Sequence, residues 1–162
     1  MARFVDAIDL PVSVEDAFAF LADFSRTAEW DPSVLHAERL TGGRVRKGSR
    51  FRVVVSLLGR QLPLEYEITE FDKPSRLVLV GGDETLRSVD EITFVARPHG
   101  TRVTYEAKLE LRGLRKLADP ALHVLFQLVG RLAVCGLRRR MDAIREANGA
   151  SDAQNQGERK AS

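Results

Sequence analysis

The sequence is poor in the residues that build covalent, metal or nucleophilic sites. Its 162 residues include one cysteine, Cys135, and three widely spaced histidines. One cysteine cannot form an intrachain disulfide, and the histidines lack the close spacing of a metal-ligand cluster. The G-x-S-x-G elbow of serine hydrolases and the G-x-G-x-x-G fingerprint of dinucleotide-binding proteins are both absent. We therefore expect a protein that works without a metal, a nucleotide or another cofactor.

Long apolar runs and concentrated charge are also missing. No apolar stretch reaches the roughly 18 residues of a membrane-spanning helix, and the first residues lack the apolar core of a signal peptide. We therefore expect no integral membrane segment and a cytoplasmic location. The 25 Lys and Arg nearly balance the 23 Asp and Glu. The run Arg138–Arg140 is interpreted as a solvated helix face, so nucleic acid is not an expected partner.

The middle of the chain consists of alternating apolar and polar residues, and each run ends in turn residues. With a first run near the N-terminus, this pattern predicts seven strands, at residues 3–10, 34–40, 49–58, 62–71, 76–80, 85–96 and 101–111. Short turns join most consecutive strands, which favours an antiparallel meander.

Helical patterns occur at both ends of this sheet sequence. Ser13 is a plausible cap of one short helix, and a second one at residues 26–30 should end at Asp31-Pro32. A long helix should begin at Asp119-Pro120 and end at Asn148-Gly149, with Cys135 packed in its apolar stripe. Because residues 148–162 contain no large apolar side chain, we expect one domain, residues 1–147, followed by a disordered tail.

Five separated segments then carry a family resemblance: residues 8–12 running into 14–18, then 28–34, 48–51 and 100–104. In this order they resemble the helix-grip domains of the START-like (SRPBCC) superfamily, and most of all its polyketide cyclase/dehydrase and lipid-transport family. The resemblance implies an α+β fold in which a seven-stranded curved antiparallel sheet surrounds a long C-terminal helix. Two short helices are expected between strands one and two.

A curved sheet around a helix leaves a space that side chains need not fill, and we expect a ligand cavity there. The alternation assigns inward-facing residues to several strands and to the helix. The predicted ligand-binding residues are Trp30, Phe51, Val53, Val55, Leu64, Tyr66, Asp90, Ile92, Phe94, Tyr105, Phe126, Val129 and Ala133. Trp30 either packs at the end of the sheet or stacks on a ligand. Small residues at Gly130 and Gly136 either leave room or allow close backbone contact.

Asp90 is the one ionisable residue that the alternation places on an otherwise apolar inner face. A buried carboxylate must be hydrogen-bonded, paired or protonated, whereas a bulge at this point would turn the side chain toward water. Two hypotheses remain open. The protein is a carrier or binding protein for an apolar small molecule of lipid, polyketide or isoprenoid type. Alternatively, it is a polyketide cyclase or dehydratase whose catalytic groups are Asp90, Tyr66, Tyr105 and His123. The oligomeric state is left open.

Overall fold

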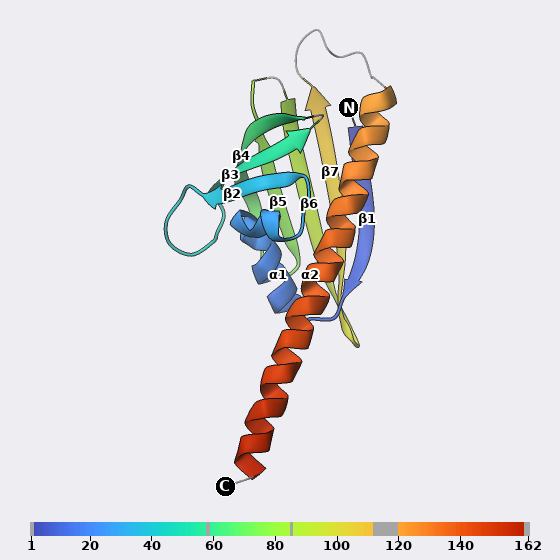
Figure 1. Ribbon diagram of the computed structural model, residues 1–162. Coiled ribbons are helices and arrows are strands. Elements are labelled where there is room, and N and C mark those ends of the chain that lie inside the picture. The colour runs from blue at the N-terminus through green and yellow to red at the C-terminus, as the bar shows by residue number, and fades with distance from the viewer. Residues whose placement is uncertain (1, 58, 85, 112–119, 161–162) are drawn as a thin grey trace.

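A curved sheet of seven antiparallel strands faces one long C-terminal helix (Figure 1). The structure is a computed structural model that describes residues 2–57, 59–84, 86–111 and 120–160. Within these ranges, the side chains of residues 57, 111, 120–123, 125 and 148–160 are not described. The strands are β1 (Ala2–Leu10), β2 (Val34–Arg39), β3 (Arg50–Leu57), β4 (Arg60–Asp72), β5 (Arg76–Gly82), β6 (Leu86–Arg97) and β7 (Gly100–Leu111).

The strand order is β1-β7-β6-β5-β4-β3-β2, so the meander from β2 to β7 ends beside the first strand. Every neighbouring pair is antiparallel, and β1 pairs with β7 from Ala2↔Leu109 to Leu10↔Thr101. The predicted seven-stranded antiparallel fold is thus confirmed. The register shifts once between β2 and β3 and once between β4 and β5, which adds local twist to the sheet.

Two short helices connect β1 to β2, as predicted: α1 (Val14–Ala22) and the 3-10 helix η1 (Phe24–Glu29). Ser13 caps α1, since its Oγ accepts a 3.1 Å hydrogen bond from the Asp16 backbone N–H. Phe18 of α1 packs its ring 5.2 Å from that of Phe94 in β6. This end of the sheet is therefore filled by core side chains.

The long helix α2 (Pro120–Lys160) begins at the predicted proline but does not end where expected. The predicted stop at Asn148-Gly149 is wrong, because the helix continues to Lys160 and projects beyond the sheet (Figure 1). One glycine costs a helix only about 1 kcal/mol, and the residues that follow include Ala, Gln, Glu, Arg and Lys, which favour helix. The division into a domain and a tail stays a prediction. No helix in the described part of the chain is long and apolar enough to span a membrane.

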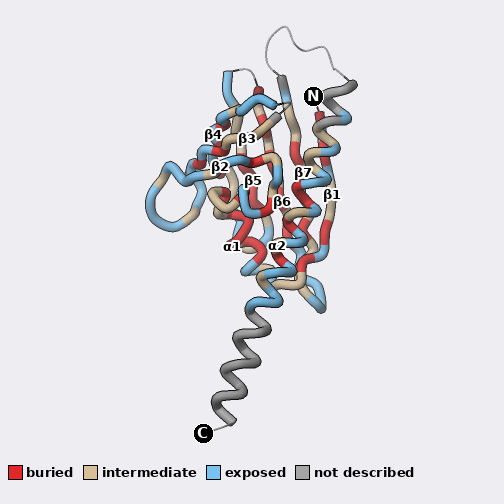
Figure 2. Tube along the Cα trace, viewed as in Figure 1, coloured by how far each residue is buried: buried red, intermediate tan, exposed pale blue. Residues whose placement is uncertain are grey.

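The helix α2 contacts the rest of the domain with one side, as the burial pattern in Figure 2 indicates. Ala133, Val134, Leu137 and Met141 are buried there. A side chain at Gly136 would overlap with the Trp30 carbonyl oxygen, and a Cβ at Gly130 would lie 2.6 Å from the Phe4 ring. Both glycines therefore permit close contact rather than leave room. Cys135 is exposed, so its predicted core position is wrong.

Candidate functional site

A partly open cavity of about 160 Å³ lies between the concave face of the sheet and α2. Its walls come from β1, η1 and the loop after it, from β2, β3, β4, β6 and β7, and from α2. The structure brings most of the predicted ligand-binding residues together on these walls: Trp30, Val53, Val55, Leu64, Tyr66, Asp90, Tyr105, Phe126, Val129 and Ala133. The cavity is thus mostly apolar, with a few polar groups on one part of its wall.

Three predicted residues lie on the concave face but outside the cavity lining. Phe51 and Ile92 are completely buried and Phe94 is 4% exposed, so these side chains form solid core. Phe24 of η1 packs against Phe51 with their ring centroids 6.2 Å apart. The alternation identifies the correct face, but it does not show where the short helices fill that face. His123 is the fourth predicted catalytic residue, and its side chain lies outside the described part of the structure.

Asp90 is buried on the cavity wall, with 4% of its surface exposed. The Ser88 hydroxyl lies 3.4 Å from Oδ1 and 3.5 Å from Oδ2 of Asp90, and donates a long hydrogen bond. Burial raises the pKa of Asp90 to about 7, while hydrogen bonds from Ser88 and Tyr66 oppose the rise and the charge of Asp31 adds to it. Asp90 therefore exists in both protonation states near neutral pH.

Asp31 is a second carboxyl group on the same cavity, and sequence reasoning missed it. Its Oδ1 accepts hydrogen bonds from the Ser33 backbone N–H at 2.8 Å and from the Ser33 hydroxyl at 2.7 Å. Burial raises the pKa of Asp31, and the hydrogen bonds from Ser33 oppose that rise. The dipeptide Asp31-Pro32 is a strong helix stop, so the local sequence explains Asp31 as the end of a helix and gives no sign that it lines the cavity.

Two tyrosines supply hydroxyl groups beside these acids. Burial raises the pKa values of Tyr66 and Tyr105, and the negative charge of Asp90 raises them further, so both hydroxyls keep their protons and can donate hydrogen bonds. The Tyr66 ring packs over Gly81, where an added Cβ would lie only 2.5 Å from it. Trp30 contacts Tyr105 edge to face, at 6.2 Å between centroids. Trp30 thus packs against the sheet and also lines the cavity.

The described lining contains two carboxyl groups and no Lys, Arg or His. Its polar groups can donate hydrogen bonds from tyrosine, serine and threonine hydroxyls and from protonated Asp90, or accept them at the carboxylate oxygens. Such a site can orient an uncharged, largely apolar molecule through one or two polar atoms. In the described part of the chain, no group of three or more His, Cys, Asp or Glu is arranged to hold a metal ion.

The sheet order, the covering helix and the cavity define a START-like helix-grip domain, and solved structures share this fold. A START superfamily protein from Mycobacterium smegmatis aligns with a TM-score of 0.75 at 12% identity, covering 89% of this chain and 99% of that one. TTHA0849 from Thermus thermophilus aligns with a TM-score of 0.72 at 20% identity, covering 88% and 98%. SA2116 from Staphylococcus aureus, a protein of unknown function, aligns with a TM-score of 0.69 at 12% identity, covering 90% and 96%.

Residues 1–142 match the family described as polyketide cyclase / dehydrase and lipid transport, and the chain belongs to that family. No curated protein matches the sequence. The predicted superfamily and family are therefore both confirmed. Family and fold together indicate a START-like domain of the hydrophobic-ligand-binding type.

Proposed function

We propose that the protein binds an apolar small molecule of lipid, polyketide or isoprenoid type in the cavity, as a carrier or binding protein. The observation that carries this proposal is the mostly apolar cavity beneath α2, with hydroxyl and carboxyl groups on part of its wall. An apolar wall supplies affinity through burial, and a few fixed polar groups select the orientation of the ligand.

The size of the cavity narrows the choice of ligand. Its volume of about 160 Å³ is close to the roughly 150 Å³ of an engineered apolar cavity that holds one benzene molecule. The space as it stands therefore suits one ring or a short branched chain, and a longer ligand must extend through the open side. The hydroxyls of Tyr66 and Tyr105 on the cavity wall favour a ligand that carries an oxygen, such as a carbonyl or hydroxyl group.

A matched pair of substitutions on α2 tests this binding. Val129→Trp fills the cavity, whereas Leu128→Trp adds the same side chain one residue away, on the exposed side of the helix. In a fluorescence titration with a naphthol-type probe, Val129→Trp should abolish binding and Leu128→Trp should retain it. Absence of binding to the wild type, or equal binding by both variants, contradicts the proposal.

The second candidate function is a polyketide cyclase or dehydratase, and two carboxyl groups with different hydrogen-bond partners on the cavity wall favour it. Asp31 accepts two short hydrogen bonds from Ser33, which oppose the rise in its pKa caused by burial. Asp90 has a pKa of about 7 and can give up or take a proton near neutral pH. Two acids on one cavity wall can serve as base and acid when one is ionised and the other protonated, while Tyr66 or Tyr105 donates to a developing enolate oxygen. His123 stays part of this hypothesis.

Turnover separates the two candidates. If the protein is an enzyme, incubation with a poly-keto model compound should yield a cyclised or dehydrated product detectable by mass spectrometry. Asp90→Asn and Asp31→Asn should then reduce turnover strongly while the naphthol-type probe still binds. If the wild type binds the probe and gives no product with such compounds, the carrier proposal is favoured over the enzyme.

A further inference from the structure

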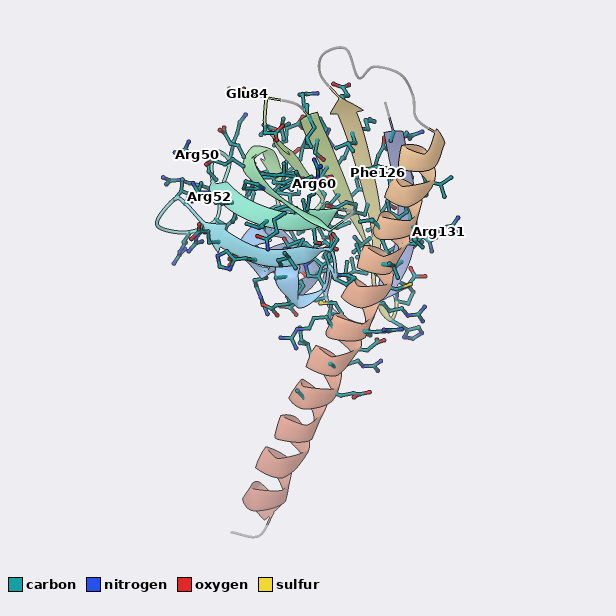
Figure 3. The ribbon with its side chains drawn as sticks, turned by 45° about the horizontal axis from the view of Figure 1, so that its top comes forward. Arg50, Arg52, Arg60, Glu84, Phe126 and Arg131 are labelled. Atoms are coloured by element: carbon teal, nitrogen blue, oxygen red, sulfur yellow. The ribbon has the colours of Figure 1, made fainter. Side chains whose placement is uncertain are left out.

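The side of α2 that faces away from the sheet is apolar although it is exposed. Val124, Leu128 and Leu132 are 67%, 54% and 50% exposed, and Cys135 is exposed as well. Their spacing of three and four residues places these side chains on one side of the helix. The opposite side of the same turns lines the cavity, and Figure 3 shows Phe126 pointing toward the sheet. A surface helix normally has a polar outer side, so this exposed apolar row is unusual.

Between residues 124 and 139, the same outer side also carries positive charge without negative charge, and the exposed Asp142 follows one turn after Arg138. Arg131 points away from the sheet (Figure 3), and at about 100° per residue Arg138 and Arg139 follow it on this side. None of these three forms an ion pair with a described residue. From residue 120 to residue 141 the sequence contains no Asp or Glu. We call this surface the outer face of α2, made up of Val124, Leu128, Arg131, Leu132, Cys135, Arg138 and Arg139.

Charge complementarity distinguishes between possible partners of this face. A second copy of the chain would bring its own arginines to the contact, and between residues 124 and 139 neither copy has an acidic residue to pair with them. The first acidic residue after them, Asp142, lies beyond the apolar row. An anionic bilayer matches both the apolar row and the positive charge of this face. Apolar side chains enter the boundary between headgroups and acyl chains, while arginines contact the phosphates.

We propose that the outer face of α2 docks on the surface of an anionic lipid bilayer. The helix lies along the interface and does not cross it. Because its inner side closes the cavity, docking places the cavity next to the phase in which apolar molecules dissolve. The docking surface and the cavity lining share no residue, so docking is tested separately from ligand binding.

The segment between β2 and β3 is a competing basic surface on the same molecule. Arg39, Arg44, Arg46, Lys47 and Arg50 occur within twelve residues, and no Asp or Glu lies between residues 39 and 64. This segment lacks the row of strongly exposed large apolar side chains found on α2. It can attract anions by charge alone, and it therefore provides the internal control for a purely electrostatic effect.

The chain offers a built-in probe, since its single cysteine lies on the proposed surface. A polarity-sensitive dye attached to Cys135 should shift to the blue when phosphatidylcholine vesicles containing phosphatidylglycerol are added. Pure phosphatidylcholine vesicles should give a much smaller shift. The matched control carries the dye at Leu35 in the variant Cys135→Ser/Leu35→Cys, because Leu35 is 53% exposed on β2. That dye should not shift.

Vesicle co-sedimentation measures how much the apolar side chains of the outer face contribute to binding. Leu128→Gln/Leu132→Gln should lose most of the binding to the phosphatidylglycerol-containing vesicles. Leu35→Gln/Val95→Gln should keep it, although these two side chains are 53% and 52% exposed and hence equally apolar and accessible. Circular dichroism checks that each variant keeps the fold. If a variant does not fold, the dye experiment still tests the proposal, because it uses the chain without substitutions.

The same assay measures how much the arginines of the outer face contribute to vesicle binding. Arg138→Gln/Arg139→Gln should weaken binding roughly 30-fold, from about 1 kcal/mol per arginine at an anionic surface. Arg44→Gln/Arg46→Gln should change it far less. Equal binding to anionic and neutral vesicles overturns the proposal, and so does a loss caused by the Arg44 and Arg46 pair instead. It is also overturned if light scattering shows a dimer that Leu128→Gln/Leu132→Gln dissociates, with no vesicle binding by the wild type.

Discussion

Replacing Asp90 with asparagine removes a carboxyl group that is buried in the folded protein and exposed in the unfolded chain. The pKa of Asp90 is about 7 in the folded state and 3.8 when unperturbed. Between these values the folded state holds a proton that the unfolded chain has released, so folding stability falls as pH rises through this range. A difference of about three pKa units corresponds to roughly 4 kcal/mol of folding stability. Roughly 3 kcal/mol of this stability is lost between about pH 5 and about pH 8.5.

Denaturant unfolding of the wild type and Asp90→Asn at these two pH values gives the required comparison. The variant should gain roughly 3 kcal/mol relative to the wild type on going from the lower to the higher pH, because asparagine does not ionise. Asp142→Asn, an exposed substitution on α2, serves as the control and should show no such change. Glu29 and Glu106, whose pKa values are lowered to about 2, affect stability only in more acidic solution. A pH-independent difference between the wild type and Asp90→Asn would refute the argument.

Substitutions at three further positions test a contact at the cavity, the contact between α2 and Trp30, and the cap of α1. Gly81→Ala should weaken probe binding in a fluorescence titration, because the new Cβ would lie 2.5 Å from the Tyr66 ring and displace it; unchanged affinity contradicts this. Gly136→Ala should lower stability by roughly 1–3 kcal/mol in denaturant unfolding, because the added carbon overlaps with the Trp30 carbonyl oxygen, whereas helix propensity alone would raise stability by about 1 kcal/mol. Ser13→Ala should cost about 1 kcal/mol of unfolding free energy and Ser13→Thr much less, since only alanine removes the N-cap oxygen.

Local sequence periodicity predicts the sheet and leaves two directions for Asp90, inward or, with a bulge, toward water. Burial alternates along β6 from Leu86 to Phe94, as a period-two pattern requires. Asp90 belongs to this inward row, and no bulge separates it from its neighbours. The sequence also predicts the start of α2 at Pro120, because proline fits the first turn of a helix.

The extent of the cavity and part of its polar wall depend on contacts between distant segments. Phe51 and Phe94 share the inward face, but η1 and α1 fill the space in front of them, which no strand pattern reveals. Asp31 follows a short helix in an irregular loop, where periodicity gives no direction. The apolar stripe of α2 predicts one broad buried face and therefore a core position for Cys135. The structure divides that stripe into an inner and an outer side.

The two faces of the sheet are encoded by alternate residues of the same strands, and they use different interactions. In β4, Leu64 and Tyr66 face the cavity, while Glu65 between them is exposed and pairs with Arg52 of β3 at 3.1 Å. Substitutions at the inward positions can therefore change the shape of the cavity without removing the ion pairs outside. This separation provides a physical route by which chains only 12–20% identical to this one can keep its fold while their cavities diverge.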